Sequence, residues 1–224
     1  MTATSRTRKS KEILFVREAA MGMTFNHPHI AKIYKVAQSE RYLYFVSEVI
    51  PGVDLVRHVE KRGPIPEAAA NKIFRQMLEA VAYVHANHVV HRDIKLENFR
   101  LDDRTGRVVM LDFGLASFYL PDEMLKQNCG SPAYAAPEIH ANVAYHGPGI
   151  DVWSLGVSLY AMCAAQLPWP TEHHANLGDA IRTKAWPAPR AVWSFELSDL
   201  ISGMLEKDPA KRMTIKQIAV HPWM

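Results

Sequence analysis

The sequence is poor in cysteine, in net charge and in acidic residues near its start, and each shortage excludes a class of protein. Its two cysteines, Cys129 and Cys163, are too few for a disulfide framework and stand in no metal-ligand spacing. A formal net charge of +3 over 224 residues is too small to predict nucleic-acid binding. These shortages place the chain, by default, in a reducing cytoplasmic compartment.

No stretch has the composition of a membrane span. Residues 152–169 lack formal charge, but they include serine, glutamine and proline, so we expect a buried helix there. The first eleven residues contain four basic side chains and no acid. A transit peptide has such a composition, but no amphipathic arginine-rich helix is clear, so residues 1–11 are expected to form a solvated basic tail. Residues 12–25 then have apolar side chains at helical spacing, and residues 30–36 and 42–49 alternate like a hairpin.

One stretch gathers the residue types that phosphoryl transfer needs. Residues 91–98 have the sequence H-R-D-I-K-L-E-N, and D-F-G follows at residues 112–114. Asp93 can orient a substrate hydroxyl and accept its proton, and Lys95 can offset charge on the moving phosphoryl group. Asn98 and Asp112 offer the hard oxygen ligands that Mg²⁺ prefers.

These two motifs resemble the H-R-D-x-x-x-x-N and D-F-G signatures of the eukaryotic protein kinases, in the same order and spacing. A lone D-F-G recurs by chance, whereas the pair is specific. The sequence is most similar to the serine/threonine kinases of the calcium/calmodulin-dependent and AMP-activated groups. The resemblance implies an α+β, protein-kinase-like fold, ATP and Mg²⁺ at the site, and a protein substrate with a serine or threonine hydroxyl.

The resemblance divides the chain into three parts. Residues 1–11 are the basic tail, residues 12–49 a partial small lobe of one helix and two strands, and residues 50–224 a largely helical large lobe. In kinases, upstream strands bear a glycine-rich loop and a lysine that pairs with the helix glutamate, here Glu18. No such loop or lysine-bearing strand precedes Glu18 in this sequence, so we expect a truncated small β lobe.

The resemblance also implies nucleotide contacts. Glu48 and Val49 fall in the segment between the lobes, whose backbone binds adenine. Asp54 can accept from a ribose hydroxyl or, as in an ordinary turn, cap the following helix. Arg100 takes the place of an apolar residue under adenine, where it would lose contact area unless it turned away. Gly22 replaces a large apolar side chain and is expected to leave a hole.

The activation segment, residues 112–138, departs from the kinase pattern at one position. Gln127 replaces the threonine whose phosphate Arg92 would bind, and a neutral amide does not replace two negative charges. Activation by phosphorylation there is therefore not expected, although Ser117 or Ser131 could be modified. Ser131 should approach Asp93 and Lys95, as in serine/threonine kinases.

Two further carboxylates are given structural roles by the resemblance. Asp151 should brace the catalytic loop through backbone donors. Glu138 should form a buried ion pair with Arg212.

Two functions from different classes follow. The first is a serine/threonine protein kinase that transfers the γ-phosphoryl group of ATP to protein hydroxyls. Such a kinase could be regulated by another protein. The second is a pseudokinase or docking module, or a fragment of a longer active kinase. The pseudokinase hypothesis is favoured by the absent glycine-rich loop and lysine, and by Arg100 and Gly22. The intact set of Asp93, Lys95, Asn98 and Asp112 favours the first.

Overall fold

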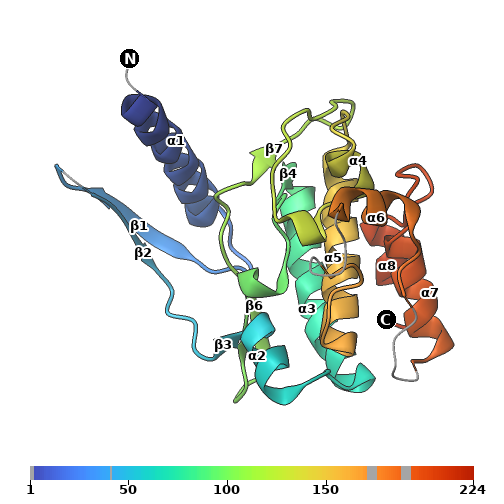
Figure 1. Cartoon of the computed structure of the whole chain (residues 1–224). Helices are drawn as coiled ribbons and strands as arrows, with labels where there is room; N and C mark the ends of the chain where they lie inside the picture. Colours follow the sequence, from blue (N-terminus) through green and yellow to red (C-terminus); the bar gives the residue numbers. More distant parts are fainter. Residues whose placement is uncertain (1–2, 41, 171–175, 188–192) are drawn as a thin grey trace.

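Two parts of different composition make up the structure, a computed structural model that describes residues 3–40, 42–170, 176–187 and 193–224. Figure 1 shows helix α1 and a β-hairpin standing beside a larger, mostly helical body. The helices are α1 (Ala3–Thr24), α2 (Leu55–Arg62), α3 (Glu67–Ala86), α4 (Pro137–His140), α5 (Gly147–Ala164), α6 (Leu177–Thr183), α7 (Phe195–Met204) and α8 (Ile215–Ala219). The strands are β1 (Ile33–Gln38), β2 (Leu43–Ser47), β3 (Val53–Asp54), β4 (Val89–Val90), β5 (Phe99–Asp102), β6 (Arg107–Met110) and β7 (Ser117–Phe118), with short 3-10 helices η1 (Leu96–Asn98) and η2 (Pro132–Tyr134).

Helix α1 begins earlier than the sequence predicted. The expected start at Glu12 was wrong, because the helix already runs from Ala3. Residues 3–11 contain neither proline nor glycine to interrupt it. The segment predicted as a tail is therefore helical from Ala3 on, while residues 1–2 lie outside the described part.

Strands β1 and β2 form the predicted antiparallel hairpin. On one face, Phe45 stacks on Phe15 of α1, with ring centroids 4.0 Å apart. Because side chains alternate along a strand, Tyr44 and Val46 point to the other face, where both are exposed. Within the described residues, α1 thus covers one face of a two-stranded sheet.

Gly22 leaves no hole where α1 meets the hairpin. A Cβ atom built on Gly22 would lie 2.4 Å from Cδ1 of Ile33, which is itself buried. The prediction of a hole was wrong, because a residue from β1 fills the space that a larger helix side chain would occupy. Glycine is needed here for close approach between helix and strand.

The body is built around α5, which lies between α3 and α7 (Figure 1). The uncharged run that begins at Val152 is buried in this helix as far as Cys163, which confirms the expected buried helix. Helix α3 packs against α5, and its Ile73, Phe74 and Met77 side chains are buried in the core. No helix in the described residues is long and apolar enough to cross a membrane.

A buried ion pair ties the activation segment to the far end of the body. Arg212 Nη1 lies 2.6 Å from Glu138 Oε1, and Nη2 lies 2.9 Å from Oε2. The Arg212 guanidinium also lies over the ring of Trp153, 5.1 Å from its centroid. The predicted pairing of Glu138 with Arg212 is confirmed.

A small sheet positions the residues that the sequence singled out. Strand β5 pairs antiparallel with both β3 and β6. Asn98 lies directly before β5, and Asp112 lies two residues after β6. The antiparallel pairing brings the start of β5 beside the end of β6, so the two motifs meet at one edge of the sheet.

Candidate active site

Asp151 of α5 anchors the loop that contains Asp93. This carboxylate accepts hydrogen bonds from the backbone N–H groups of His91, at 2.8 Å, and Arg92, at 2.9 Å, and from Nε2 of His85, at 2.8 Å. Burial alone would raise the pKa of Asp151, but the hydrogen bond and charge of His85 outweigh it and lower the pKa. Arg92 has a φ of 65°, which these bonds stabilise. The predicted bracing role of Asp151 is confirmed.

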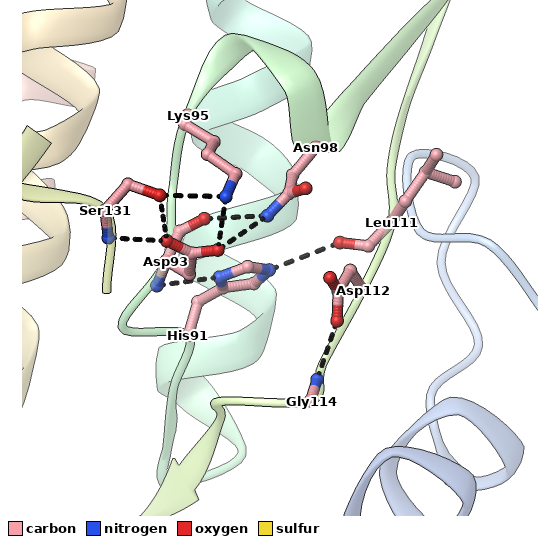
Figure 2. A network of polar contacts seen from close by, with 8 residues as sticks. All are labelled: His91, Asp93, Lys95, Asn98, Leu111, Asp112, Gly114 and Ser131. Carbon is pink, nitrogen blue, oxygen red and sulfur yellow. Dashed lines mark hydrogen bonds and ion pairs between the residues drawn. The ribbon is translucent and has the colours of Figure 1, made fainter. Parts of the chain in front are cut away.

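Asp93 lies at the centre of a polar network (Figure 2). Its Oδ2 lies 2.7 Å from Nζ of Lys95, and its Oδ1 accepts from both the backbone N–H and the hydroxyl of Ser131, each at 2.9 Å. Lys95 also donates to Ser131 Oγ at 2.8 Å. Burial raises the pKa of Asp93, but the hydrogen bonds from Lys95 and Ser131 exceed that effect and leave the pKa lowered. The carboxylate is therefore ionised at neutral pH.

The side chains of Asn98 and Asp112 are each held in place by one hydrogen bond to a backbone group. The Asn98 amide NH₂ donates to the backbone carbonyl of Asp93 at 2.8 Å. Asp112, at a φ of 59°, accepts from the backbone N–H of Gly114 at 2.9 Å. Figure 2 shows both side chains in one region with Asp93 and Lys95, between the catalytic loop and the segment after β6.

This donor set fits Mg²⁺. One amide oxygen and one carboxylate are hard ligands, and Mg²⁺ in nucleotide sites takes the rest of its shell from water and phosphate. The described residues contain no cluster of three or more His, Cys, Asp or Glu side chains that would form an all-protein metal site.

Phe113 fixes the segment that bears Asp112. Its ring is buried between His91 and Phe25, with centroids 5.2 Å and 5.1 Å away. His91 Nε2 lies 3.3 Å from the carbonyl oxygen of Leu111. These contacts join the H-R-D loop to the D-F-G segment, so Asp93 and Asp112 keep one relative position.

Glu18 of α1 faces this site from the small part. Its Oε2 lies 3.8 Å from the place that a Cβ on Gly114 would occupy. Burial, followed by the charge of Asp112, raises the pKa of Glu18 from 4.5 to about 7. Among the described side chains, none of the lysines or arginines forms an ion pair with Glu18. That Glu18 is the glutamate of the family's lysine–glutamate pair stays a prediction from the resemblance.

Of the residues predicted to contact the nucleotide, Glu48, Val49 and Asp54 form no hydrogen bond with the described part of this network. The Glu48 carboxylate pairs with Arg107 at 2.6 Å, so its side chain is engaged elsewhere. Val49 is 89% exposed. Asp54 caps α2 by accepting from the backbone N–H of Arg57 at 2.9 Å, which is the ordinary alternative given for this residue.

Arg100 turns away from the core side of β5. Phe99 and Leu101 are buried in the core, so Arg100 points to the opposite face. There its Nη2 donates to the carbonyl oxygen of Gly52 at 2.6 Å. Its Nε is buried and has no partner in the described structure. The Arg100 guanidinium is thus held at the backbone of Gly52, and where it lies relative to adenine stays a prediction.

Two functional contacts were not foreseen. Tyr145 donates from its hydroxyl to the carbonyl oxygen of Gln127 at 2.7 Å, and His85 contacts Asp151. His85 lies in the last turn of α3, and no sequence pattern indicated its partner. No sequence signal pointed to Tyr145, because the contact joins two loops.

Comparison with known proteins agrees with this geometry. The family described as "Protein kinase domain" matches residues 1–224. Serine/threonine-protein kinase SIK2 of Gallus gallus is 40% identical over 208 residues, which are 93% of this chain and 26% of that protein. Serine/threonine-protein kinase SIK1 of Rattus norvegicus and of Mus musculus match with the same identity and coverage. The chain thus spans about a quarter of the length of these relatives, and it belongs to the protein kinase family.

Proposed function

We propose that this chain is a serine/threonine protein kinase domain that transfers the γ-phosphoryl group of ATP to a protein hydroxyl. The observation on which this rests is the network around Asp93, in which an ionised carboxylate, an ammonium group and a hydroxyl lie within 3 Å of one another. The 40% identity to proteins named serine/threonine-protein kinases supports the same activity.

Asp93 is assigned to the substrate hydroxyl. Its lowered pKa keeps it an acceptor, able to orient the hydroxyl and to take the proton late in the reaction. The hydroxyl oxygen forms a bond to the γ-phosphorus, the bond from that phosphorus to the bridging oxygen breaks, and ADP leaves. The proton then resides on Asp93, so atoms and charge balance.

Lys95 is assigned to the transferring phosphoryl group. Its ammonium lies within hydrogen-bond distance of both Asp93 and Ser131. A cation held there offsets negative charge as the phosphoryl group moves, which is the main electrostatic help that such a site can give. Ser131 fixes the distance between the catalytic loop and the activation segment.

Asn98 and Asp112 are assigned to Mg²⁺. Bound there, the ion would neutralise phosphate charge. The chain's own part is to hold the amide and the carboxylate in place, through Asp93 and Gly114. For the nucleotide itself, we assign adenine to the backbone of Glu48 and Val49, and the ribose to Asp54 in addition to its capping role.

Two measurements test this proposal. A thermal shift with ATP and Mg²⁺ should raise the melting temperature of the parent chain, and Asp112→Asn should reduce that rise. On a peptide array, the parent should phosphorylate serine or threonine peptides, and Asp93→Ala should abolish the product.

A chain that neither shifts with ATP and Mg²⁺ nor labels a peptide would contradict the proposal. The large-lobe surface would then serve as a docking module without transfer. Glu60→Gln, on the exposed side of α2, is the matched control and should behave as the parent in both assays.

A further inference from the structure

Arg92 is a buried cation with neutral partners. Its side chain is 6% exposed, and Nε donates to the carbonyl oxygen of Leu115 at 2.7 Å. No carboxylate among the described residues forms an ion pair with it. A buried charge is costly unless oxygens around it compensate. The groups that supply those oxygens therefore stabilise the folded position of Arg92.

Gln127 supplies one of them from the activation segment. Its Oε1 accepts from Nη1 of Arg92 at 3.5 Å. The backbone carbonyl of the same residue accepts from the Tyr145 hydroxyl at 2.7 Å. One residue of the segment thus contacts both the catalytic loop and the loop that leads to α5.

The residues on either side of Gln127 are fixed as well. Leu125 and Tyr145 exchange backbone hydrogen bonds, each at 2.9 Å. The Asn128 amide donates to the carbonyl oxygen of Ile139 at 3.0 Å and to Oδ1 of Asn142 at 2.7 Å. The segment is therefore held at three consecutive places by neutral groups.

The sequence of this stretch contains no hydroxyl that a serine/threonine kinase could modify. Residues 118–130 include neither serine nor threonine. Ser131 comes next, but its hydroxyl already contacts Asp93 and Lys95. Gly130, at a φ of 102°, approaches the backbone of Arg92 so closely that a Cβ would lie 2.5 Å from its carbonyl oxygen. Any shift at residues 125–128 would therefore reach Ser131 and the catalytic loop directly.

We propose that Gln127 is a positioning residue: its side chain contacts Arg92, its backbone carbonyl accepts from Tyr145, and together these contacts hold the activation segment in the substrate-accepting arrangement without a phosphate. The inference rests on the proposed kinase function, since it names how that site is kept in order. It also means that phosphorylation within residues 118–130 is not the step that orders this segment.

Hydrogen–deuterium exchange of the whole chain tests the positioning. Gln127→Ala should speed exchange over residues 118–130 by about 3- to 10-fold, as expected for the loss of the one side-chain hydrogen bond to Arg92, since alanine keeps the backbone carbonyl to which Tyr145 donates. Gln127→Glu places a carboxylate opposite Arg92 and should keep exchange at or below the parent rate. Lys126→Ala, at an exposed neighbouring position, is the control and should match the parent.

Exchange in Gln127→Ala equal to that of the parent would overturn the inference. So would equal loosening in the alanine and glutamate variants, because contact with Arg92 would then not be what holds the segment. This readout needs no activity, so it decides the inference even if phosphoryl transfer is not found.

Where transfer is found, steady-state kinetics adds a second readout. Gln127→Ala should raise KM for the peptide several-fold with little change in KM for ATP, and Gln127→Glu should restore it. Prior phosphatase treatment of the parent should leave its rate unchanged. A peptide KM that does not move in Gln127→Ala, or a rate that falls after phosphatase treatment, would contradict the positioning role.

Discussion

The two sides of the candidate site differ in how firmly they are held. On the large-lobe side, Asp93 has three close hydrogen-bond contacts and rests on a loop anchored by Asp151. On the small-lobe side, Glu18 shows no ion pair to a described cation, and its helix packs on a two-stranded hairpin. The residues proposed for proton and phosphoryl transfer thus lie in the part with more hydrogen bonds, whereas the side proposed to face the nucleotide has few contacts.

The largest expected loss of stability comes from breaking the buried Glu138–Arg212 ion pair in the body, and it would show how firmly the large-lobe side is held. Glu138→Ala leaves Arg212 buried and uncompensated, and should lower the free energy of unfolding by about 3–5 kcal/mol. Urea denaturation measures it. The double change Glu138→Leu with Arg212→Met should recover much of the loss, since an apolar pair removes the orphan charge.

A surface ion pair provides the matched control. Arg182→Ala breaks the contact with Asp179, where both side chains are about half exposed. It should change stability by less than about 1 kcal/mol. If both pairs gave similar losses, burial would not be what sets the difference.

The second effect concerns the anchor under the catalytic loop. Asp151→Ala removes the acceptor of two buried backbone N–H groups, those of His91 and Arg92. We expect a loss of about 3 kcal/mol in the free energy of unfolding, with loss of peptide phosphorylation. Asp122→Ala, an exposed acid in the activation segment, should leave both unchanged. A stable but inactive Asp151→Ala would show that the anchor orients the loop without supporting the fold.

A smaller effect tests the packing of the small part. Gly22→Ala adds a Cβ only 2.4 Å from the Ile33 side chain, so overpacking should exceed the helix-propensity gain, for a net loss of about 1 kcal/mol. Adding Ile33→Ala to the variant should relieve the clash. A stabilised Gly22→Ala would mean that there is a hole beside α1 after all.

A further effect, confined to one pH range, is the pH dependence of Glu18. A carboxyl whose pKa rises from 4.5 to about 7 on folding favours the folded state most below 4.5, and this contribution is lost as pH rises through about 7. Without nucleotide or metal, Glu18→Gln should therefore melt higher than the parent at pH 8 and close to it at pH 5. Equal melting differences at both pH values would show that Glu18 does not carry this proton.

The sequence predicted best where a residue's role depends on its near neighbours. The H-R-D and D-F-G motifs and the buried helix that begins at Val152 were predicted, because motif spacing and an uncharged run specify them locally. The Glu138–Arg212 pair joins residues far apart in the sequence and was predicted only from the family resemblance. The start of α1 was missed, because a run of polar residues without proline or glycine is compatible with both helix and tail. The space beside Gly22 was misjudged, because Ile33 reaches it from a strand that sequence spacing does not relate to the helix.

The same limit explains the activation segment. The absence of threonine at residue 127 was evident, and phosphorylation there was rejected for that reason. The hydroxyl of Tyr145 and the amide of Asn128 are polar groups that any loop can contain, so nothing in the sequence indicated that they would hold the segment. Contacts between loops are set by tertiary structure and need coordinates.

The two-stranded hairpin has a consequence for ligand affinity. A pair of strands with one covered face is marginal by itself, so α1 and the hairpin should open more readily than the body. Any molecule that must bridge both sides then binds only the closed fraction of the population. Its apparent dissociation constant is the intrinsic value divided by that fraction, so stiffening the hairpin would tighten binding without any new contact.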